Sequence, residues 1–228
     1  MSRSTQVTIT AAPWKSLLEN TLNENKEKTK NIFNVAVGTV QGNRPRVRMM
    51  VHRAFQGNLL LTTTDIRMNK IHQLEDSYVD NKGSPIDYVF WIEPAIRQFR
   101  FTGNAFLLPS PCHRNPTPLS DYLINSGIDF EQKRIDIYNS MSRSLRASFA
   151  KPFSPGSHRS WDENSHPSPD KVESDDQDEW YQKGLDNFAL LVVDPFQVDY
   201  CDLLTQPNQR KVFTLNEQNA WIEEDVHP

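Results

Sequence analysis

The sequence predicts a mainly β fold of the α+β class, an antiparallel barrel or sandwich to which helices are added. Strand-like runs outnumber helical ones, and short links that contain glycine or proline join several of them, as in antiparallel sheets. Hydrophobic residues make up 37% of the 228 positions and aromatic residues 10%, which is enough for a packed core and excludes a wholly disordered chain. We expect a single domain over residues 1–228.

Local patterns justify the elements of the N-terminal half. A helix is predicted from Pro13, because apolar side chains recur at helical spacing between Trp14 and Leu22. Two strand-like runs then meet at a short link with Gly57, which is typical of a hairpin. Asp65 follows the second of these runs and can cap the next helix.

The remaining elements repeat this alternation of strands and helices. Residues 93–96 are a plausible tight connection between two aromatic strands, and apolar strands return after residue 187. The predicted strands cover 31–40, 46–54, 58–64, 86–92, 97–108, 187–193, 196–204, 210–215 and 220–224, and the later helices cover 66–74, 119–126 and 130–150.

One segment differs in composition from the rest of the chain. Between residues 154 and 179 only Trp161 and Val172 are strongly apolar, and three prolines interrupt regular structure. The run Asp170–Glu179 carries a net charge of −5, so without it the total of −4 becomes +1. We predict an acidic, disordered insertion loop over residues 154–180 of a nearly neutral body.

Composition and motifs exclude several classes of function. A net charge of −4 argues against nucleic-acid binding, and the longest apolar run, residues 188–193, is too short to span a membrane. Cys112 and Cys201 are too few for a disulfide framework or a four-cysteine zinc site, and no metal site is predicted. No secretory signal is visible, which favours the cytoplasm and leaves the nucleus open. Walker, Gly-x-Ser-x-Gly and His-Glu-x-x-His motifs are missing.

The run from Arg44 to Arg53 is the first candidate binding segment. Strand alternation puts Val47, Met49 and Val51 on one face and Arg46, Arg48, Met50 and His52 on the other. Arginines within a strand need solvent or an anion such as phosphate, which a guanidinium binds through a planar fork. A solvated edge strand is the alternative.

The run from Thr62 to Lys70 is the second candidate. A strand there ends in hydroxyl groups and leads into a helix start, where amide donors favour an anion. Lys70 can lean back toward a phosphate, and the alternative is an ordinary solvated lysine. In the third candidate, residues 90–103, Gln98 can offer both a donor and an acceptor to a planar heterocycle, or it can simply pair with backbone.

Taken in order, these segments resemble the pyridoxamine 5′-phosphate oxidase family of FMN-binding split barrels. The matching motifs are Arg48-Met-Met-Val-His-Arg53, the spacing from Thr64 to Lys70, and Trp91-Ile-Glu-Pro-Ala-Ile-Arg-Gln-Phe-Arg-Phe-Thr-Gly103. A branch of this family without an assigned reaction shares Ser142-x-x-x-Arg146-x-x-Phe149, Pro155-Gly156 and Asp194-Pro-Phe-Gln-Val-Asp199. The resemblance implies a six-stranded antiparallel split β-barrel with peripheral helices, assembled as a homodimer with FMN at the interface.

The resemblance also implies the residues that bind the cofactor. Arg48 and Lys70 would bind the phosphate, and Gln98 would reach the flavin from the second subunit, with Ser142 and Arg146 as weaker candidates from that subunit. The full implied set is Arg48, Met49, Met50, Val51, Thr63, Thr64, Asn69, Lys70, Gln98, Ser142 and Arg146 for FMN, with Arg53 and Arg210 toward a substrate. No catalytic acid or base is identified.

The sequence departs from the oxidase pattern where the family binds its substrate. The late Arg-x-His-x-Arg motif is here Arg210-Lys-Val-Phe-Thr214, the Tyr-x-x-x-Arg-x-x-x-Ser motif is missing between residues 109 and 130, and no tryptophan lies near Tyr200. Three hypotheses therefore remain open. The first is an FMN-dependent oxidoreductase of unknown small-molecule substrate, the second a non-catalytic FMN-binding or sensing protein, and the third a pyridoxamine 5′-phosphate oxidase with an altered pocket.

Overall fold

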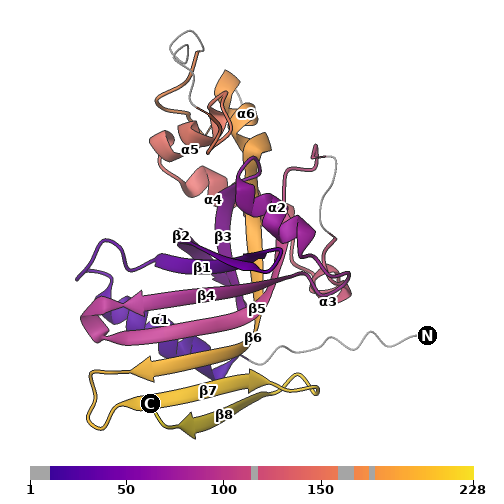
Figure 1. Ribbon diagram of the computed structural model, residues 1–228. Helices are drawn as coiled ribbons and strands as arrows, with labels where there is room; N and C mark the ends of the chain where they lie inside the picture. The colour runs from indigo at the N-terminus through magenta and orange to yellow at the C-terminus, as the bar shows by residue number, and fades with distance from the viewer. Residues whose placement is uncertain (1–10, 114–117, 159–166, 175–177) are drawn as a thin grey trace.

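The protein is described from a computed structural model, which covers residues 11–113, 118–158, 167–174 and 178–228. Eight antiparallel strands form one sheet in the order β3-β2-β1-β4-β5-β6-β7-β8, and an additional pairing of β3 with β6 closes the first six of these into a ring (Figure 1). The strands are β1 Asn34–Gln41, β2 Arg44–Gln56, β3 Leu59–Asp65, β4 Ser84–Ile92, β5 Arg97–Leu108, β6 Phe188–Asp202, β7 Gln209–Leu215 and β8 Trp221–Val226.

The predicted strands are found, with two differences. The sheet has eight strands rather than six, because β7 and β8 extend it beyond the ring. The runs 187–193 and 196–204 are parts of one strand, β6, which continues through Pro195. Pro195 pairs with Gly103 at an irregularity in the β5–β6 ladder, where a Cβ on Gly103 would lie 2.5 Å from the carbonyl oxygen of Asp194. Glycine thus permits the close approach that carries β6 past its proline.

The helices lie around the ring. Helix α1 (Pro13–Asn25) packs through Trp14, which is fully buried and makes an edge-on contact with Phe101 of β5. Helices α4 (Phe130–Ser140), α5 (Arg143–Ala150) and α6 (Glu179–Asn187) gather at the end of the ring formed by β3 and β6 (Figure 1). The other helical segments are α2 (Asn69–Asp76), the 3₁₀ turn Glu93–Ala95 and α3 (Asp121–Ile124). No described helix is long and apolar enough to cross a membrane.

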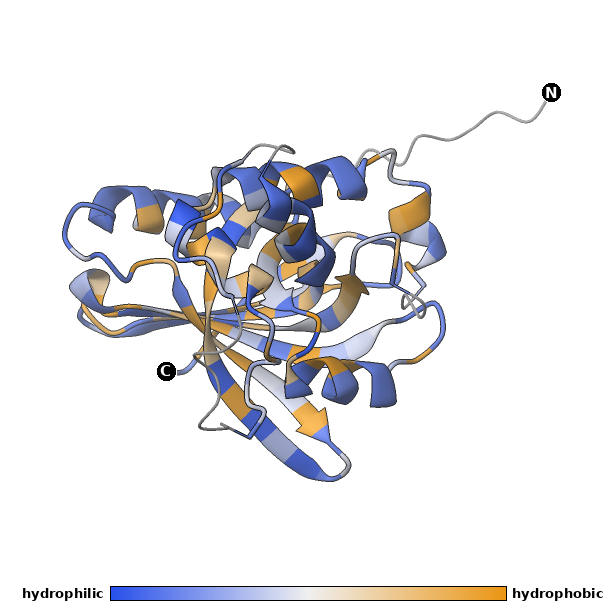
Figure 2. Cartoon of the chain, turned by 90° about the horizontal axis from the view of Figure 1, so that it is seen from above, coloured by the Kyte–Doolittle hydropathy of each residue, from blue (hydrophilic) through white to orange (hydrophobic). Residues whose placement is uncertain are grey.

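Two hydrophobic clusters make up the core. One fills the ring, and the other lies between the ring and helices α4–α6. Strand β3 supplies Leu60 to the first cluster and Leu61 to the second, and β6 likewise contributes to both. The first parts of both strands, residues 59–61 and 188–193, are buried on both faces, which explains why they read as continuous apolar runs. Seen from above, the outer surfaces of the helices are largely hydrophilic (Figure 2).

Asp65 does not cap α2, which begins at Asn69 and has Met68 as its N-cap residue. The region of α4–α6 departs from the prediction in two further places. The expected helix over 130–150 is broken at Met141–Ser142, where the Ser142 hydroxyl accepts a hydrogen bond from the Leu145 amide and caps α5. Helix α6 begins inside the segment expected to be a disordered insertion. In the same segment Val172 is fully buried, and its amide donates to the carbonyl of Arg143. This part of the insertion therefore packs against α5; residues 159–166 and 175–177 lie outside the described residues.

Candidate functional site

A pocket of about 480 Å³ opens between the ring and helix α5. One wall is formed by β2, the end of β3 and the start of α2. The facing wall is formed by α5 and the segment that follows it. The lining residues are Met49, Met50, Val51, Arg53, Thr63, Thr64, Asp65, Met68, Lys70, Leu145, Ser148, Phe149, Lys151, Phe153 and Pro155.

The alternation predicted for β2 is confirmed and decides which side chains turn inward. Met50 and His52 are buried, whereas Val47 and Met49 are 71% and 64% exposed. Arg48 shares the inward face and donates hydrogen bonds to Val37 O, Thr39 Oγ1 and Gln73 Oε1, at 3.2, 2.7 and 2.6 Å. Burial, and secondarily repulsion from Arg46, lowers the pKa of Arg48. In the described part of the chain its guanidinium is held by neutral groups.

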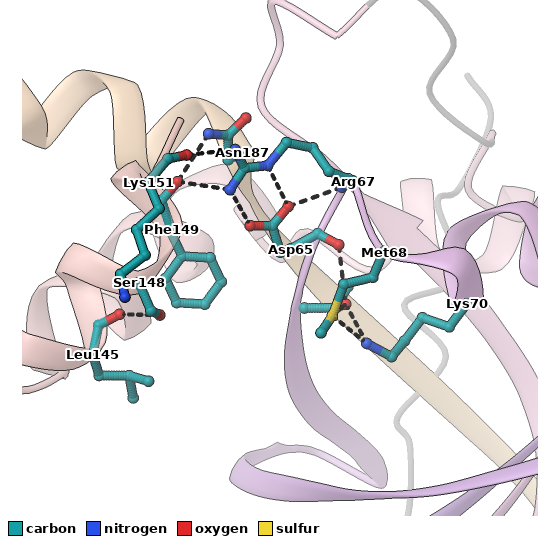
Figure 3. Close-up of polar contacts among 10 residues, drawn as sticks. Asp65, Arg67, Met68, Lys70, Leu145, Ser148, Phe149, Lys151 and Asn187 are labelled. Atoms are coloured by element: carbon teal, nitrogen blue, oxygen red, sulfur yellow. Dashed lines mark hydrogen bonds and ion pairs between the residues drawn. The ribbon is translucent and has the colours of Figure 1, made fainter. Parts of the chain in front are cut away.

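Lys70 is a half-buried cation rather than an ordinary solvated lysine. Its ammonium donates to Thr64 Oγ1 at 3.0 Å and to Met68 Sδ at 2.7 Å (Figure 3). Burial and, secondarily, repulsion from Arg48 lower the pKa of Lys70 to about 8, although attraction to Asp65 acts in the opposite direction. Among the described residues neither Lys70 nor Arg48 forms a salt bridge. Two neighbouring cations without carboxylate partners favour an anion.

Asp65 is the acid that lines the pocket in the described part of the chain, and Arg67 neutralises it. The Arg67 guanidinium donates to Asp65 Oδ1 and Oδ2 at 2.9 and 2.6 Å. The same guanidinium donates to the carbonyl oxygens of Phe149 and Lys151 at the end of α5, at 3.2 and 2.7 Å (Figure 3). One side chain therefore ties the two walls of the pocket together.

Arg53 enters the pocket through an irregularity in strand β2. The β2–β3 register shifts between His52 and Ala54, so that Arg53 is an extra residue, and such bulges re-aim side chains. Its Nε donates to Thr63 Oγ1 at 3.4 Å. Burial lowers the pKa of Arg53, and Tyr88 opposes this shift.

Several residues expected in the site do not line this pocket, and Arg48 is one of them, although it lies near enough to Lys70 to lower the pKa of that lysine. Asn69 is exposed at the start of α2. Gln98 lies in a row of paired strand residues that also contains Trp91, Cys201 and Arg210, away from the pocket of its own chain. Arg210 donates to Asp199 Oδ1 and Oδ2 at 3.0 and 2.7 Å, and Arg100 contacts the same carboxylate. Within one chain Arg210 is therefore occupied by an ion pair.

Ser142 and Arg146 of α5, expected to reach the flavin from the second subunit, do not line the pocket of their own chain. Arg146 is buried and donates to the carbonyl oxygens of Asn139, Met141 and Val172. Its guanidinium therefore links α4, α5 and the insertion. Ser142 is the exposed cap of α5. The helix reaches the pocket instead through residues that sequence reasoning missed: Leu145, Ser148, Phe149 and, beyond its end, Lys151. The Ser142-to-Phe149 pattern singled out this helix, but not which of its faces meets β3.

Comparisons with known proteins found a family and a relative with similar sequences. Residues 11–109 match the family described as "Pyridoxamine 5'-phosphate oxidase, FMN-binding domain". A protein of Arabidopsis thaliana named "Pyridoxine/pyridoxamine 5'-phosphate oxidase 2" is 28% identical over 225 residues, which cover 95% of this chain and 98% of that protein.

Solved structures show the same fold. A Nostoc punctiforme protein described as pyridoxamine 5'-phosphate oxidase-related and FMN-binding is 25% identical, with a TM-score of 0.73 over 96% of this chain and all of that one. PhzG from Burkholderia lata, 11% identical, has a TM-score of 0.66 over 100% of this chain and 98% of its own, and this likeness concerns the fold alone.

Proposed function

Over residues 11–109 the chain belongs to the family of pyridoxamine 5′-phosphate oxidase FMN-binding domains, and from this premise we propose that it binds FMN in the pocket described above and works as an oxidoreductase on a small molecule. When bound, FMN supplies the redox chemistry by accepting a hydride. The chain supplies the charges, the walls and the orientation.

The pair of cations at Arg48 and Lys70 carries the proposal. The two repel each other and have no carboxylate partner among the described residues. A phosphate monoester carries about −1.5 to −2 charges at pH 7, which matches this excess. The Thr64 hydroxyl already contacts Lys70 and lies at the same end of the pocket. We therefore assign Arg48, Lys70 and Thr64 to the FMN phosphate.

The rest of the pocket suits a planar ring. The backbone of Met49–Val51 lines one side, and Leu145, Phe149 and Phe153 line the other with apolar surface. Apolar walls exclude water and strengthen the polar contacts within the site. No side chain here is positioned to be assigned as a general acid or base.

We propose that a second copy of the chain completes the site. Val47, Met49 and Trp91 are 71%, 64% and 46% exposed on the outer surface of the sheet. An exposed apolar face of this kind is typical of an interface. Gln98 pairs with Trp91 in the β4–β5 ladder and so lies beside this face. In a dimer Gln98 would serve the pocket of the partner subunit, as the family resemblance implies.

Flavin retention tests the proposal directly. Purified protein should be yellow, with absorbance near 450 nm, and mass spectrometry of the released molecule should identify FMN. The double variant Arg48→Gln and Lys70→Gln should lose flavin while its circular dichroism spectrum is unchanged. A Lys82→Gln variant is the control, because Lys82 is exposed in a turn outside the pocket. A colourless wild-type protein that cannot be reconstituted with FMN would contradict the proposal.

Oxidation of pyridoxine or pyridoxamine 5′-phosphate is the second candidate reaction. It is favoured by the relative of that name, whose similarity extends over almost the whole chain. Stopped-flow reduction of the flavin by pyridoxamine phosphate, with NADPH as the comparison, separates this reaction from another oxidoreductase activity. Reduction by neither reagent would favour a protein that binds FMN without turning it over.

A further inference from the structure

The thioether of Met68 lies among the polar groups that we assign to the FMN phosphate. Its sulfur accepts a hydrogen bond from Lys70 Nζ at 2.7 Å and one from Thr64 Oγ1 at 3.7 Å. Lys70 Nζ and Thr64 Oγ1 are themselves 3.0 Å apart, so the three side chains form one cluster. Figure 3 shows the side chains of Met68 and Lys70 pointing toward one another, and both residues line the pocket.

The turn between β3 and α2 brings the sulfur to this position. Met68 is the N-cap residue of α2, and Lys70 is the second residue of that helix. A phosphate oxygen that binds both Lys70 and Thr64 must approach the same two groups that the Met68 sulfur contacts. The thioether therefore competes with the anion, but only weakly, because sulfur is a poor hydrogen-bond acceptor.

Met68 is accessible to a small oxidant from the pocket. It is half-buried and lines the pocket, whereas Met50 and Met141 are only 8% and 6% exposed. Met49 is 64% exposed and should be oxidised as well, but its side chain forms no hydrogen bond with any described residue. Exposure thus selects Met68 and Met49, and Met68 is the one whose sulfur contacts Lys70.

From this geometry we propose that Met68 is a redox modification site, at which hydrogen peroxide converts the thioether to a sulfoxide and thereby closes the phosphate end of the pocket to FMN. The sulfur gives an electron pair to one peroxide oxygen. An S–O bond forms, the O–O bond breaks, and the second oxygen leaves as water with both hydrogens, so that sulfur is oxidised and peroxide is reduced.

The sulfoxide changes the competition at the phosphate end. Oxidation makes the side chain polar, and the new oxygen accepts hydrogen bonds from Lys70 and Thr64 more strongly than the sulfur does. The FMN phosphate must then displace a strong acceptor rather than a weak one. This inference rests on the proposed function, because it takes Lys70 and Thr64 as phosphate ligands.

Peroxide treatment of the flavin-free full chain tests the proposal. Peptide mass spectrometry should find one added oxygen on Met68, and FMN titration should then show about tenfold weaker binding, as the loss of one charged hydrogen bond would cause. Dithiothreitol is added before the titration, because it reverses disulfides and sulfenic acids at Cys112 and Cys201 but leaves a sulfoxide in place. Methionine sulfoxide reductases should remove the oxygen and restore the affinity.

Two leucine variants identify the responsible residue, each compared with itself before and after peroxide. Met68→Leu should keep its own FMN affinity, whereas Met49→Leu should lose about as much affinity as the wild type. An equal loss in Met68→Leu would overturn the proposal, because another residue would then be responsible.

The wild-type chain supplies the remaining outcomes. The proposal is overturned if peroxide adds no oxygen to Met68, if FMN binds equally well once that oxygen is present, or if affinity does not return when the reductases have removed it. A chain that binds no FMN before peroxide is added refutes the proposed function, and this inference with it. The titration of the untreated protein therefore separates the two failures.

Discussion

The guanidinium of Arg67 donates hydrogen bonds to both carboxylate oxygens of Asp65, at 2.9 and 2.6 Å, and so removes a negative charge from a pocket that we assign to anions. The Asp65 side chain is only 6% exposed and that of Arg67 18%. The ion pair is therefore largely desolvated, and each partner depends on the other.

Replacement of Arg67 should weaken both the fold and FMN binding. Arg67→Met leaves the carboxylate of Asp65 buried without its charged partner and removes the guanidinium donor of the Lys151 carbonyl oxygen, which should cost about 3 kcal/mol of unfolding free energy. FMN should also bind more weakly, because the unpaired carboxylate repels the phosphate. Urea unfolding and flavin titration measure the two effects. Arg143→Met is the matched control, since Arg143 forms an exposed pair with Glu173 and its loss should change the unfolding free energy much less than the loss of Arg67. Equal losses in the two variants would refute this role.

Lys70 should make the stability of the FMN-free protein rise with pH. Its folded pKa of about 8 lies below the ordinary value of 10.5, so the unfolded chain binds more protons between these pH values. Stability should therefore increase from pH 8 to 10.5. Lys70→Met should abolish that increase and stabilise the FMN-free protein at pH 7 by about 1 kcal/mol, a figure reduced for solvent screening. Urea unfolding at several pH values measures this, and a parallel pH profile in the variant and the wild type would contradict it.

His52 should contribute to acid unfolding. It is buried in the ring, with Nδ1 3.1 Å from the Tyr88 hydroxyl, and burial lowers its pKa to about 3. Since the unfolded pKa is near 6.5, the unfolded chain binds more protons between pH 3 and 6.5, and stability should fall as the pH drops through this range. His52→Gln should flatten that part of the profile. Tyr88→Phe keeps the titrating imidazole of His52, so this control should retain the slope of stability against pH. A slope that is lost in Tyr88→Phe but kept in His52→Gln would rule out His52 as its source.

The insertion should contribute to stability through Val172. This side chain is fully buried in the helical cluster, whereas the neighbouring Lys171 is exposed. Val172→Ala should therefore lower the unfolding free energy by about 1–2 kcal/mol, and Lys171→Ala should change it by less than about 0.5 kcal/mol. Thermal and urea unfolding test the difference. Identical stabilities would show that Val172 packs without energetic effect.

Local pattern predicted much of the fold and one wall of the pocket. The alternation along β2 separates the inward Arg48 from the outward Met49, and the spacing from Thr64 to Lys70 lets the lysine in the first turn of α2 reach back to the end of β3. Both predictions depend on residues that are close in sequence, where backbone geometry alone decides which side chains share a face.

The second wall and the partners of the charged residues were decided by tertiary structure. Helix α5 lies about 80 residues beyond β3, as the hydrogen bonds from Arg67 to Phe149 and Lys151 record. Arg146 looks as available as Lys151 in the sequence, but it is buried on backbone carbonyls, whereas Lys151 lines the pocket and its side chain has no hydrogen bond or salt bridge to any described residue. A cationic side chain either hydrogen-bonds to acceptors of its own chain or remains available to a ligand. Which of the two occurs depends on the distant acceptors that the folded chain brings within reach, and the periodicity of the sequence carries no information about those acceptors.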